Sequence, residues 1–334
     1  MVSTFDSEIN MTPEEFRMIR DFIHEKSGMY FAENKTYLVK NRLQKRMAEL
    51  DMKTVRDYFY HVKYDVSLKE FNRLMDLVTT NETSFFRNEP QLKSFSEEVL
   101  PLIVDEKQRG RGPKSLKIWS AGCSTGEEPY TLAIMILEKL KSVNGWNVEI
   151  IANDISEEVL AKARRGEYSG LTLRNVAPDV LRRYFTPAGD LYRVNPEIKA
   201  LVKFSHLNLS DQRKISMMSN VDVVFCRNVM IYFSEEVKKQ VVRGYYNALR
   251  PGGYFYIGHS ETLHGISKAF KLVYFKNALV YQKENVTAEK TATAERTLAT
   301  SRPVPTAQTA TSADSGAARA MELLSKIKPI NVKK

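Results

Sequence analysis

The segment that most constrains the fold is Ile118–Tyr130, where an apolar run is followed by a small-residue loop and then by apolar residues at helical spacing. The loop reads Gly-Cys-Ser-Thr-Gly, and two glutamates follow it. A second apolar segment, Val148–Asp154, ends in a carboxylate. A strand, a glycine-containing turn, a helix and a second strand that ends in an acid predict the first half of a nucleotide-binding α/β unit.

The loop favours a nucleoside ligand that carries positive charge. Gly122 and Gly126 form G-x-x-x-G rather than the G-x-G-x-x-G of dinucleotide sites. Glu127 and Glu128 follow the loop, where their negative charges would repel a bound pyrophosphate. S-adenosylmethionine, with its sulfonium and ammonium groups, is such a ligand, and Asp154 could accept hydrogen bonds from its ribose. An ordinary strand-to-helix turn with surface glutamates remains the alternative for the loop alone.

Later segments extend the predicted sheet. Val221–Cys226 is a continuous apolar run of the kind found in buried parallel strands, and Tyr254–Gly258 is the next strand. Phe270–Phe275 and Ala278–Gln282 are expected to form a hairpin at the sheet edge. An antiparallel last strand on a parallel sheet favours a methyltransferase over a dehydrogenase.

Changes in pattern along the chain predict the domains. Helical periodicity without a strand signal marks a small all-α domain, and interrupted strand–helix alternation marks an inserted β element with strands near 191–194 and 202–206. A tail rich in Thr, Ala, Ser and Pro is expected to be disordered. The predicted boundaries are 1–75 for the α domain, 76–100 for a linker, 101–284 for the α/β domain, about 186–207 for the β insert, and 285–334 for the tail, in which 318–327 could form a short helix.

Composition excludes some classes of protein. The chain has no apolar run long enough to span a membrane, and its two cysteines suit a reducing compartment and offer no metal cluster. We therefore expect a cytoplasmic protein without membrane insertion or a bound metal. The net charge of +10 favours an acidic partner, which could be nucleic acid, a membrane surface or an acidic protein.

Several segments, in order over roughly residues 11–284, resemble the CheR family, the chemotaxis receptor methyltransferases that transfer a methyl group from S-adenosylmethionine to receptor glutamates. The matching segments are Thr79–Arg87, Trp119–Tyr130, Asn153–Ser156, Asn208–Leu209, Phe225–Phe233, Arg250–Gly253 and Gly258–Glu261. The resemblance implies a class I methyltransferase fold, Rossmann-like, with a mostly parallel sheet and an antiparallel last strand, preceded by the all-α domain and carrying the β insert.

The resemblance also implies roles for individual residues. Asp154 and Glu128 would be the acidic contacts of the cofactor, and Tyr232 would lie near the transferred methyl group. Arg87 and Tyr232 are the candidates for orienting the substrate carboxylate. The residues implied in cofactor binding are Asn81, Thr83, Arg87, Glu128, Asp154, Asn208, Leu209, Arg227 and Asn228.

The implied reaction agrees with the lack of an obvious His/Asp pair. A glutamate carboxylate is ionised at neutral pH, so it needs no general base before it attacks a methyl group. The enzyme must instead align the carboxylate oxygen, the methyl carbon and the sulfonium, and orientation of this kind supplies up to roughly 7 to 11 kcal/mol.

A basic helix is the expected receptor contact. Lys35, Arg42, Lys45 and Arg46 fall on one side of a helix, opposite an apolar side. A solvated basic face is the alternative reading, whereas the resemblance favours contact with the acidic helical bundle of a chemoreceptor. The short turn at Pro187–Asp190 predicts no dependence on a tethering pentapeptide at the receptor C-terminus. We expect a monomer.

Two rival functions stay open from the sequence. A nucleic-acid methyltransferase would suit the basic charge, but enzymes that methylate base amino groups usually carry Asn or Asp-Pro-Pro-aromatic after the fourth strand, where this chain has Cys226-Arg-Asn-Val. A signalling adaptor that binds the cofactor without turnover is the second rival. Candidates at every cofactor position speak against it.

Overall fold

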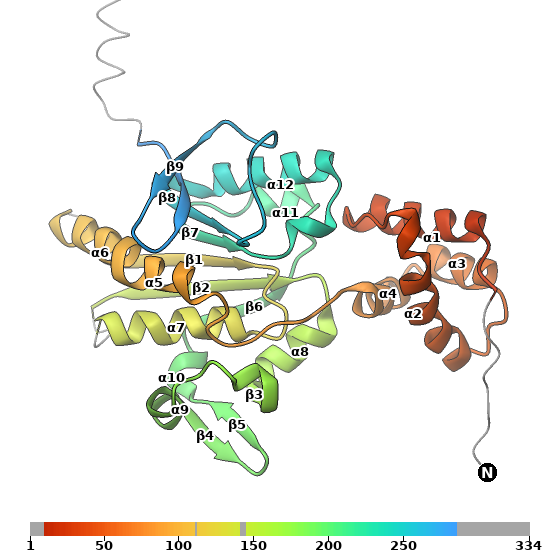
Figure 1. Ribbon diagram of the computed structural model, residues 1–334, viewed down its shortest axis with the longest axis horizontal. Helices are drawn as coiled ribbons and strands as arrows, with labels where there is room; N and C mark the ends of the chain where they lie inside the picture. The colour runs from red at the N-terminus through yellow and green to blue at the C-terminus, as the bar shows by residue number, and fades with distance from the viewer. Residues whose placement is uncertain (1–9, 111, 141–144, 286–334) are drawn as a thin grey trace, which may run out of the picture. The chain divides into compact units, whose positions relative to one another are not determined.

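A computed structural model of the protein describes residues 10–110, 112–140 and 145–285 (Figure 1). Its N-terminal part is helical: α1 starts in a capping box, in which Thr12 and Glu15 satisfy each other's backbone N–H groups, and it ends at Gly28, whose φ is 74°. Phe16, Ile19 and Leu43 are among the side chains that fill its core. The helices are α1 (Pro13–Ser27), η1 (Glu33–Lys35), α2 (Thr36–Glu49), α3 (Val55–Tyr64) and α4 (Lys69–Val78).

A seven-stranded sheet follows, with the order β6-β2-β1-β7-β8-β10-β9. The first five strands in this order pair in parallel, and β10 runs antiparallel to both of its neighbours. The predicted terminal hairpin and antiparallel last strand are therefore confirmed. The strands are β1 (Ser115–Ala121), β2 (Asn147–Asp154), β6 (Val202–His206), β7 (Val221–Cys226), β8 (Leu249–Ile257), β9 (Phe270–Tyr274) and β10 (Leu279–Lys283).

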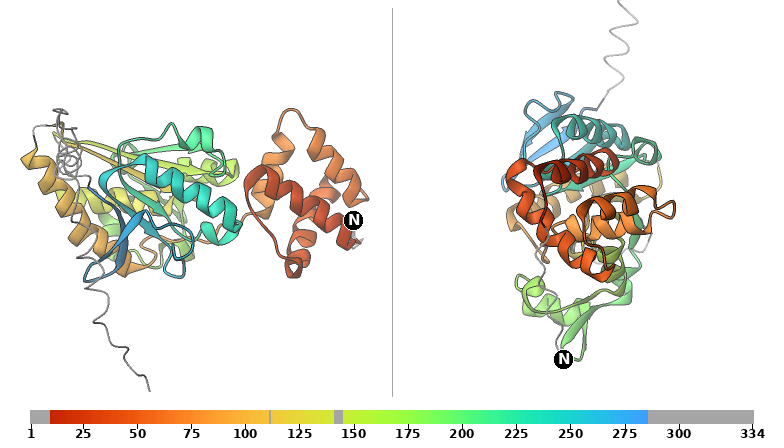
Figure 2. Two further views of the ribbon diagram at one scale, coloured as in Figure 1. Left: turned by 90° about the horizontal axis from the view of Figure 1, so that it is seen from above. Right: turned by 90° about the vertical axis from the view of Figure 1, so that its right-hand side faces the viewer.

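Helices cover both faces of this sheet (Figures 1 and 2). Along β7, Val223 and Phe225 belong to the core on the face of α6 and α7, whereas Val224 belongs to the core on the face of α11 and α12. This alternation follows from the two-residue period of a strand, and burial of both faces explains the continuous apolar run. The helices are α5 (Glu89–Lys93), the π-helical η2 (Ser94–Val99), α6 (Leu100–Arg109), α7 (Glu127–Leu140), α8 (Glu157–Arg165), α11 (Gln212–Ile215), η4 (Met230–Tyr232) and α12 (Glu235–Ala248).

The inserted β element differs from the prediction. It is a three-stranded antiparallel sheet, β3-β5-β4, made of β3 (Glu167–Tyr168), β4 (Phe185–Ala188) and β5 (Leu191–Val194). The prediction was wrong for Val202–His206, because this segment is β6, which pairs in parallel with β2 at the edge of the main sheet. It was also wrong at the start, since the small sheet begins at Glu167.

Short helices connect the small sheet to its surroundings. They are η3 (Gly170–Leu173), α9 (Pro178–Tyr184) and α10 (Pro196–Lys199), of which α9 packs on β4 and α10 on α7. The predicted tail, including the helix at 318–327, lies outside the described residues except for Asn285.

Candidate cofactor site

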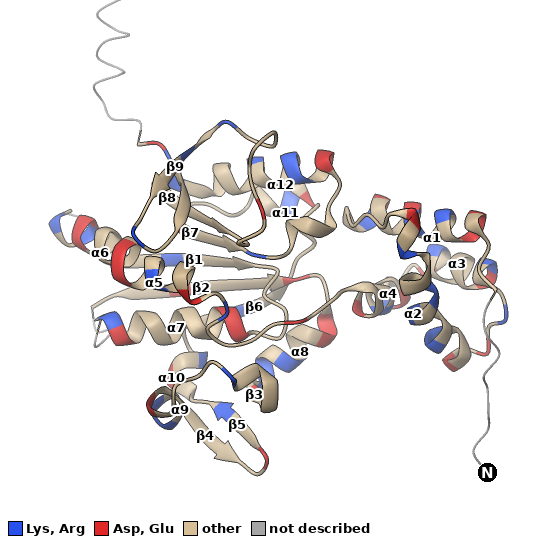
Figure 3. Cartoon of the chain, viewed as in Figure 1, with Lys and Arg blue, Asp and Glu red and all other residues tan. Residues whose placement is uncertain are grey.

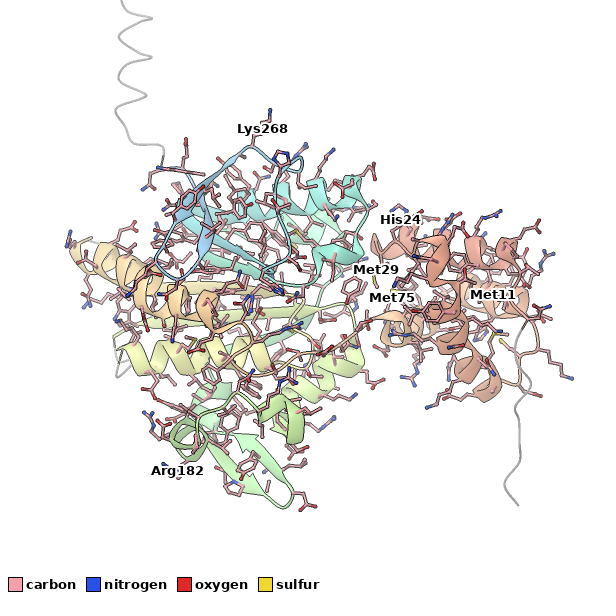
Figure 4. All side chains as sticks on the ribbon, viewed as in Figure 1. Met11, His24, Met29, Met75, Arg182 and Lys268 are labelled. Atoms are coloured by element: carbon pink, nitrogen blue, oxygen red, sulfur yellow. The ribbon has the colours of Figure 1, made fainter. Side chains whose placement is uncertain are left out.

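A pocket opens at the carboxyl ends of β1, β2 and β7, where the strand order of the sheet reverses. Ligands of open α/β sheets bind at this point. The pocket holds about 1030 Å³ of empty volume, part of it open to solvent. Met29, which precedes η1, also lines it, so the helical N-terminal part contributes to its wall (Figure 4).

All ten residues predicted to bind the cofactor or orient the substrate carboxylate line this one pocket. They come from the linker, the first turn of α7, the ends of β2, β6 and β7, and η4. Their individual roles stay predictions, but the fold brings them together. They are Asn81, Thr83, Arg87, Glu128, Asp154, Asn208, Leu209, Arg227, Asn228 and Tyr232.

The glycine loop has a conformation that requires glycine at its first position. Gly122 has φ of 81°, and a Cβ atom there would collide with the side chain of Val229. The N–H groups of Gly122 and Cys123 both donate to the carbonyl of Asn153, at 2.8 and 2.9 Å. The loop is thereby held against the end of β2, and its backbone lies open to the pocket.

Asp154 lies at the end of β2 with both carboxylate oxygens held by backbone donors. The N–H of Ser124 donates to Oδ2 at 2.8 Å, and the N–H of Ser156 donates to Oδ1 at 3.0 Å. Burial raises the pKa of Asp154 above its ordinary value, although these N–H donors oppose the shift. A buried acceptor, fixed in orientation and lining the pocket, fits the ribose hydroxyls of a nucleoside.

Part-buried Glu128 and buried Arg227 form an ion pair that joins the linker to the sheet. Glu128 accepts from Ser120 Oγ at 2.7 Å and from Arg227 Nη1 at 3.3 Å. Arg227 also donates from Nη2 to the carbonyl of Arg87 at 2.6 Å and from Nε to Gln91 Oε1 at 2.9 Å. The Arg227 guanidinium therefore fixes the linker above the pocket, and Glu128 keeps one carboxylate in the pocket wall.

The linker closes over the glycine loop. Ser124 Oγ donates to the carbonyl of Asn81 at 3.3 Å, and Asn81 Nδ2 donates to Thr79 Oγ1 at 3.1 Å. Arg87 donates from Nη1 to the carbonyl of Glu82 at 2.7 Å. These contacts hold the linker over the predicted cofactor site.

Asn208 serves as a turn former as well as a lining residue. Its Oδ1 accepts from the N–H of Ser210 at 3.0 Å, and its Nδ2 donates to the carbonyl of Lys26, the residue next to the end of α1, at 2.6 Å. Leu209 is buried beside it. Asn208 therefore connects the helical N-terminal part to the pocket.

Tyr232 ends the short helix η4, whose position the N-terminal part fixes. The carbonyl of Tyr232 accepts from the N–H of Tyr30 at 2.8 Å, and Met29 pairs with Phe233 in an antiparallel bridge. Tyr232 also lines the pocket, so its phenol adds a hydrogen-bond donor to the wall.

Basic residues lie along α2 (Figure 3), and their side chains differ in their contacts. Arg42 donates from Nη1 to the carbonyls of Leu77 and Thr79, both at 2.7 Å, and Arg46 pairs with Glu70 at 2.6 Å. Lys35 and Lys45 are exposed. Both guanidinium groups therefore bind partners within the chain, whereas the two lysines face solvent, and receptor contact by the four residues stays a prediction.

The sequence analysis missed two residues that hold pocket-lining side chains in place through hydrogen bonds. Gln91 is buried and bonds both Arg227 and the carbonyl of Ile257, yet a lone glutamine in a helical segment gives no signal. Ser124 has φ of 49° and supplies the N–H that holds Asp154. Its place between the loop glycines was the only available hint.

The strand order, the glycine loop after β1 and the buried acid after β2 define the class of S-adenosylmethionine-dependent methyltransferases. Residues 81–279 match the family described as "CheR methyltransferase, SAM binding domain", and residues 14–79 match "CheR methyltransferase, all-alpha domain". The chain belongs to the CheR methyltransferase family, and its cofactor is S-adenosylmethionine.

Curated relatives that match this chain over most of their length are named as chemotaxis protein methyltransferases. "Chemotaxis protein methyltransferase 2" of Vibrio cholerae is 35% identical over 278 residues, which cover 83% of this chain and 95% of the relative. "Chemotaxis protein methyltransferase 1" of Pseudomonas aeruginosa is 35% identical, with 80% and 97% covered, and "Chemotaxis protein methyltransferase" of Escherichia coli K12 is 34% identical, with 78% and 89% covered. The chain is therefore a methyltransferase of chemotaxis.

The described residues contain no helix long and apolar enough to cross a membrane. Within the same part of the chain, no group of three or more His, Cys, Asp or Glu side chains is arranged to hold a metal ion.

Proposed function

We propose that the protein transfers methyl groups from S-adenosylmethionine to glutamate side-chain carboxylates in the helical bundle of chemoreceptors. The observation that carries the proposal is the composition of the pocket, whose lining combines the carboxylates of Asp154 and Glu128 with the Tyr232 phenol and the Arg87 guanidinium. This arrangement suits a cationic cofactor on one side and an acidic substrate on the other.

The proposed cofactor contacts follow the chemistry of the lining. Asp154 accepts the ribose hydroxyls, and Glu128 offsets the positive charge of the methionine portion. Asn208 and Leu209 flank the adenine, since one supplies an amide and the other a buried apolar surface. The other proposed contacts are Arg227 and Asn228 at the methionine portion, and Asn81, Thr83 and Arg87 in the linker that covers the site.

The protein's own contribution to methyl transfer is alignment. The cofactor supplies a methyl group bound to a positively charged sulfur, and the substrate carboxylate needs no base because it is already ionised. Tight pairing with Arg87 would stabilise the carboxylate and lower its nucleophilicity. Tyr232, as a neutral donor, orients the carboxylate with a smaller loss of nucleophilicity.

Cofactor affinity should depend on pH through Asp154. Its ionised form accepts two ribose donors, whereas its protonated form accepts fewer, and burial raises its pKa. The protonated fraction grows as pH falls, so affinity should be constant above the raised pKa and decrease below it. Calorimetric titration with S-adenosylhomocysteine across acidic pH measures this decrease. Asp154→Asn, which cannot titrate, should bind weakly with no such decrease, and an identical decrease in that variant would contradict the assignment.

Receptor contact is proposed to use the exposed lysines of the α2 region. Lys45→Glu should raise the KM for receptor about threefold to fivefold and leave kcat unchanged, because exposed ion pairs contribute up to about 1 kcal/mol. The effect should shrink at high salt. Lys271→Glu, an equally exposed lysine on β9, is the matched control. Equal KM values for the two variants would contradict this surface.

We also propose that the protein works as a monomer in the cytoplasm without a tether on the receptor. The support for the compartment is that Cys123 and Cys226 are buried, unpaired thiols.

The support for tether independence is the tight connection between β4 and β5, whose residues Ala188 and Leu191 pair directly. Receptors that lack their last residues should therefore be methylated at the rate of intact receptors, and a large loss would contradict this.

The decisive experiment uses methyl-labelled S-adenosylmethionine with chemoreceptor-containing membranes from the protein's own host. Base treatment should release the label as methanol, because carboxyl methyl esters hydrolyse in base. Label that resists base, or that appears in nucleic acid, would contradict the glutamate proposal. Labelling without receptor would point to another substrate.

A further inference from the structure

The segment Gly258–Glu261, which follows β8, contacts the pocket loops without lining the pocket. Its Glu261 carboxylate accepts three backbone N–H groups. Oε2 accepts from Gly258 at 2.6 Å and from Asn228 at 3.0 Å, and Oε1 accepts from Ile231 at 3.2 Å. One side chain therefore joins the ends of two neighbouring strands, β7 and β8.

The donors belong to the loop that carries proposed site residues. Asn228 has φ of 61°, a left-handed conformation that needs support from its surroundings in a residue other than glycine. Ile231 lies in η4, where N–H groups of the first turn have no partner inside the helix. Hydrogen bonds to an ionised carboxylate are shorter and stronger than neutral ones. Glu261 thus stabilises both the left-handed residue and the turn that ends in Tyr232.

Gly258 is adapted to this contact. A Cβ atom at this position would lie 2.6 Å from Glu261 Oε2 and 2.9 Å from the nitrogen of Asn228. Both distances are too short for real atoms, so any side chain would push the carboxylate or the loop away. Because Gly258 has no side chain, its N–H and the N–H of Asn228 can both donate to Glu261 Oε2.

We propose that Glu261 is a positioning residue for methyl transfer, which fixes the backbone of Asn228–Tyr232 so that Tyr232 meets the substrate carboxylate in line with the methyl group. This inference rests on the proposed role of Tyr232. Glu261 lies outside the lining of the proposed cofactor pocket. It acts only through the loop.

Glu261→Gln tests the proposal with little change in size. The amide replaces one acceptor oxygen by a donor, so at least one of the three N–H groups faces another N–H. We expect kcat to fall about tenfold with the receptor KM unchanged, since a small misplacement of an orienting group affects the chemical step. Glu235→Gln is the matched control, because Glu235 is a nearby exposed carboxylate that pairs with Lys238. This control should keep wild-type kinetics.

Two further variants separate positioning from a general loss of stability. Glu261→Asp keeps the charge but shortens its reach, so its kcat should lie between those of wild type and Glu261→Gln. Gly258→Ala should lower kcat in the same way, and combination with Glu261→Gln should add little, since both changes disturb one contact. Additive losses, or equal kcat for the Asp and Gln variants, would overturn the proposal.

Amide hydrogen exchange gives a readout that needs no receptor. The N–H groups of Asn228 and Ile231 should exchange faster in Glu261→Gln than in Glu235→Gln, while the amides of β7 keep their protection. Unchanged exchange at these two positions, or wild-type kcat in Glu261→Gln, would overturn the proposal. If wild-type protein fails to methylate receptor, the proposed function fails, and the exchange result still decides whether Glu261 holds the loop.

Discussion

Asp154→Ala should weaken binding of S-adenosylmethionine by about 2 to 4 kcal/mol, a loss of about 30-fold to 1000-fold in affinity. The carboxylate is buried at the end of β2, and the N–H groups of Ser124 and Ser156 fix its orientation. Because the chain holds the acceptor in place before the ligand binds, little orientational entropy is lost on binding. Removal of the carboxylate leaves both ribose hydroxyls without charged acceptors.

Calorimetric titration with S-adenosylmethionine measures this loss directly. Asp190→Ala is the matched control, since Asp190 is exposed in the turn between β4 and β5, outside the pocket. Thermal melting should accompany both titrations, because the two N–H donors lose their acceptor in Asp154→Ala. Unchanged affinity in a folded Asp154→Ala variant would refute the ribose assignment.

Much of the fold could be predicted because its signals are local. The apolar run Val221–Cys226 and the helical spacing after Gly126 each identify an element without reference to the rest of the chain. The partner of a strand is not a local property. Val202–His206 has a short alternating pattern that suits either sheet, and only its pairing with β2 places it in the larger one.

The functional site, like the fold, could be predicted only in part. The carboxyl ends of parallel strands meet at one edge, so Asp154 and Arg227 could be expected to converge. The partners of α2 could not be predicted, because Arg46 pairs with Glu70, a residue of another helix, and Arg42 donates to backbone carbonyls that carry no sequence signal. A helical projection gives the direction of a side chain but not the segment that lies opposite.

Tyr232→Phe should lower turnover about 10-fold to 100-fold while it changes cofactor affinity little. The aromatic ring stays in the pocket wall, and the backbone stays fixed by the bond from Tyr30, so only the hydroxyl donor is lost. That donor is proposed to act on the substrate carboxylate, which is absent when the cofactor binds alone. Single-turnover methyl transfer and calorimetry separate the two effects.

Arg87 is the alternative orienting group, since it also lines the pocket and donates to the carbonyl of Glu82. If Arg87 alone oriented the carboxylate, Tyr232→Phe would keep nearly full turnover, and Arg87→Lys would lose most of it because an ammonium cannot reproduce the planar fork. Tyr232→Phe with strongly reduced cofactor affinity but normal turnover would assign the hydroxyl to the cofactor instead. A loss confined to kcat would establish that alignment of the substrate, and not cofactor binding, depends on the tyrosine.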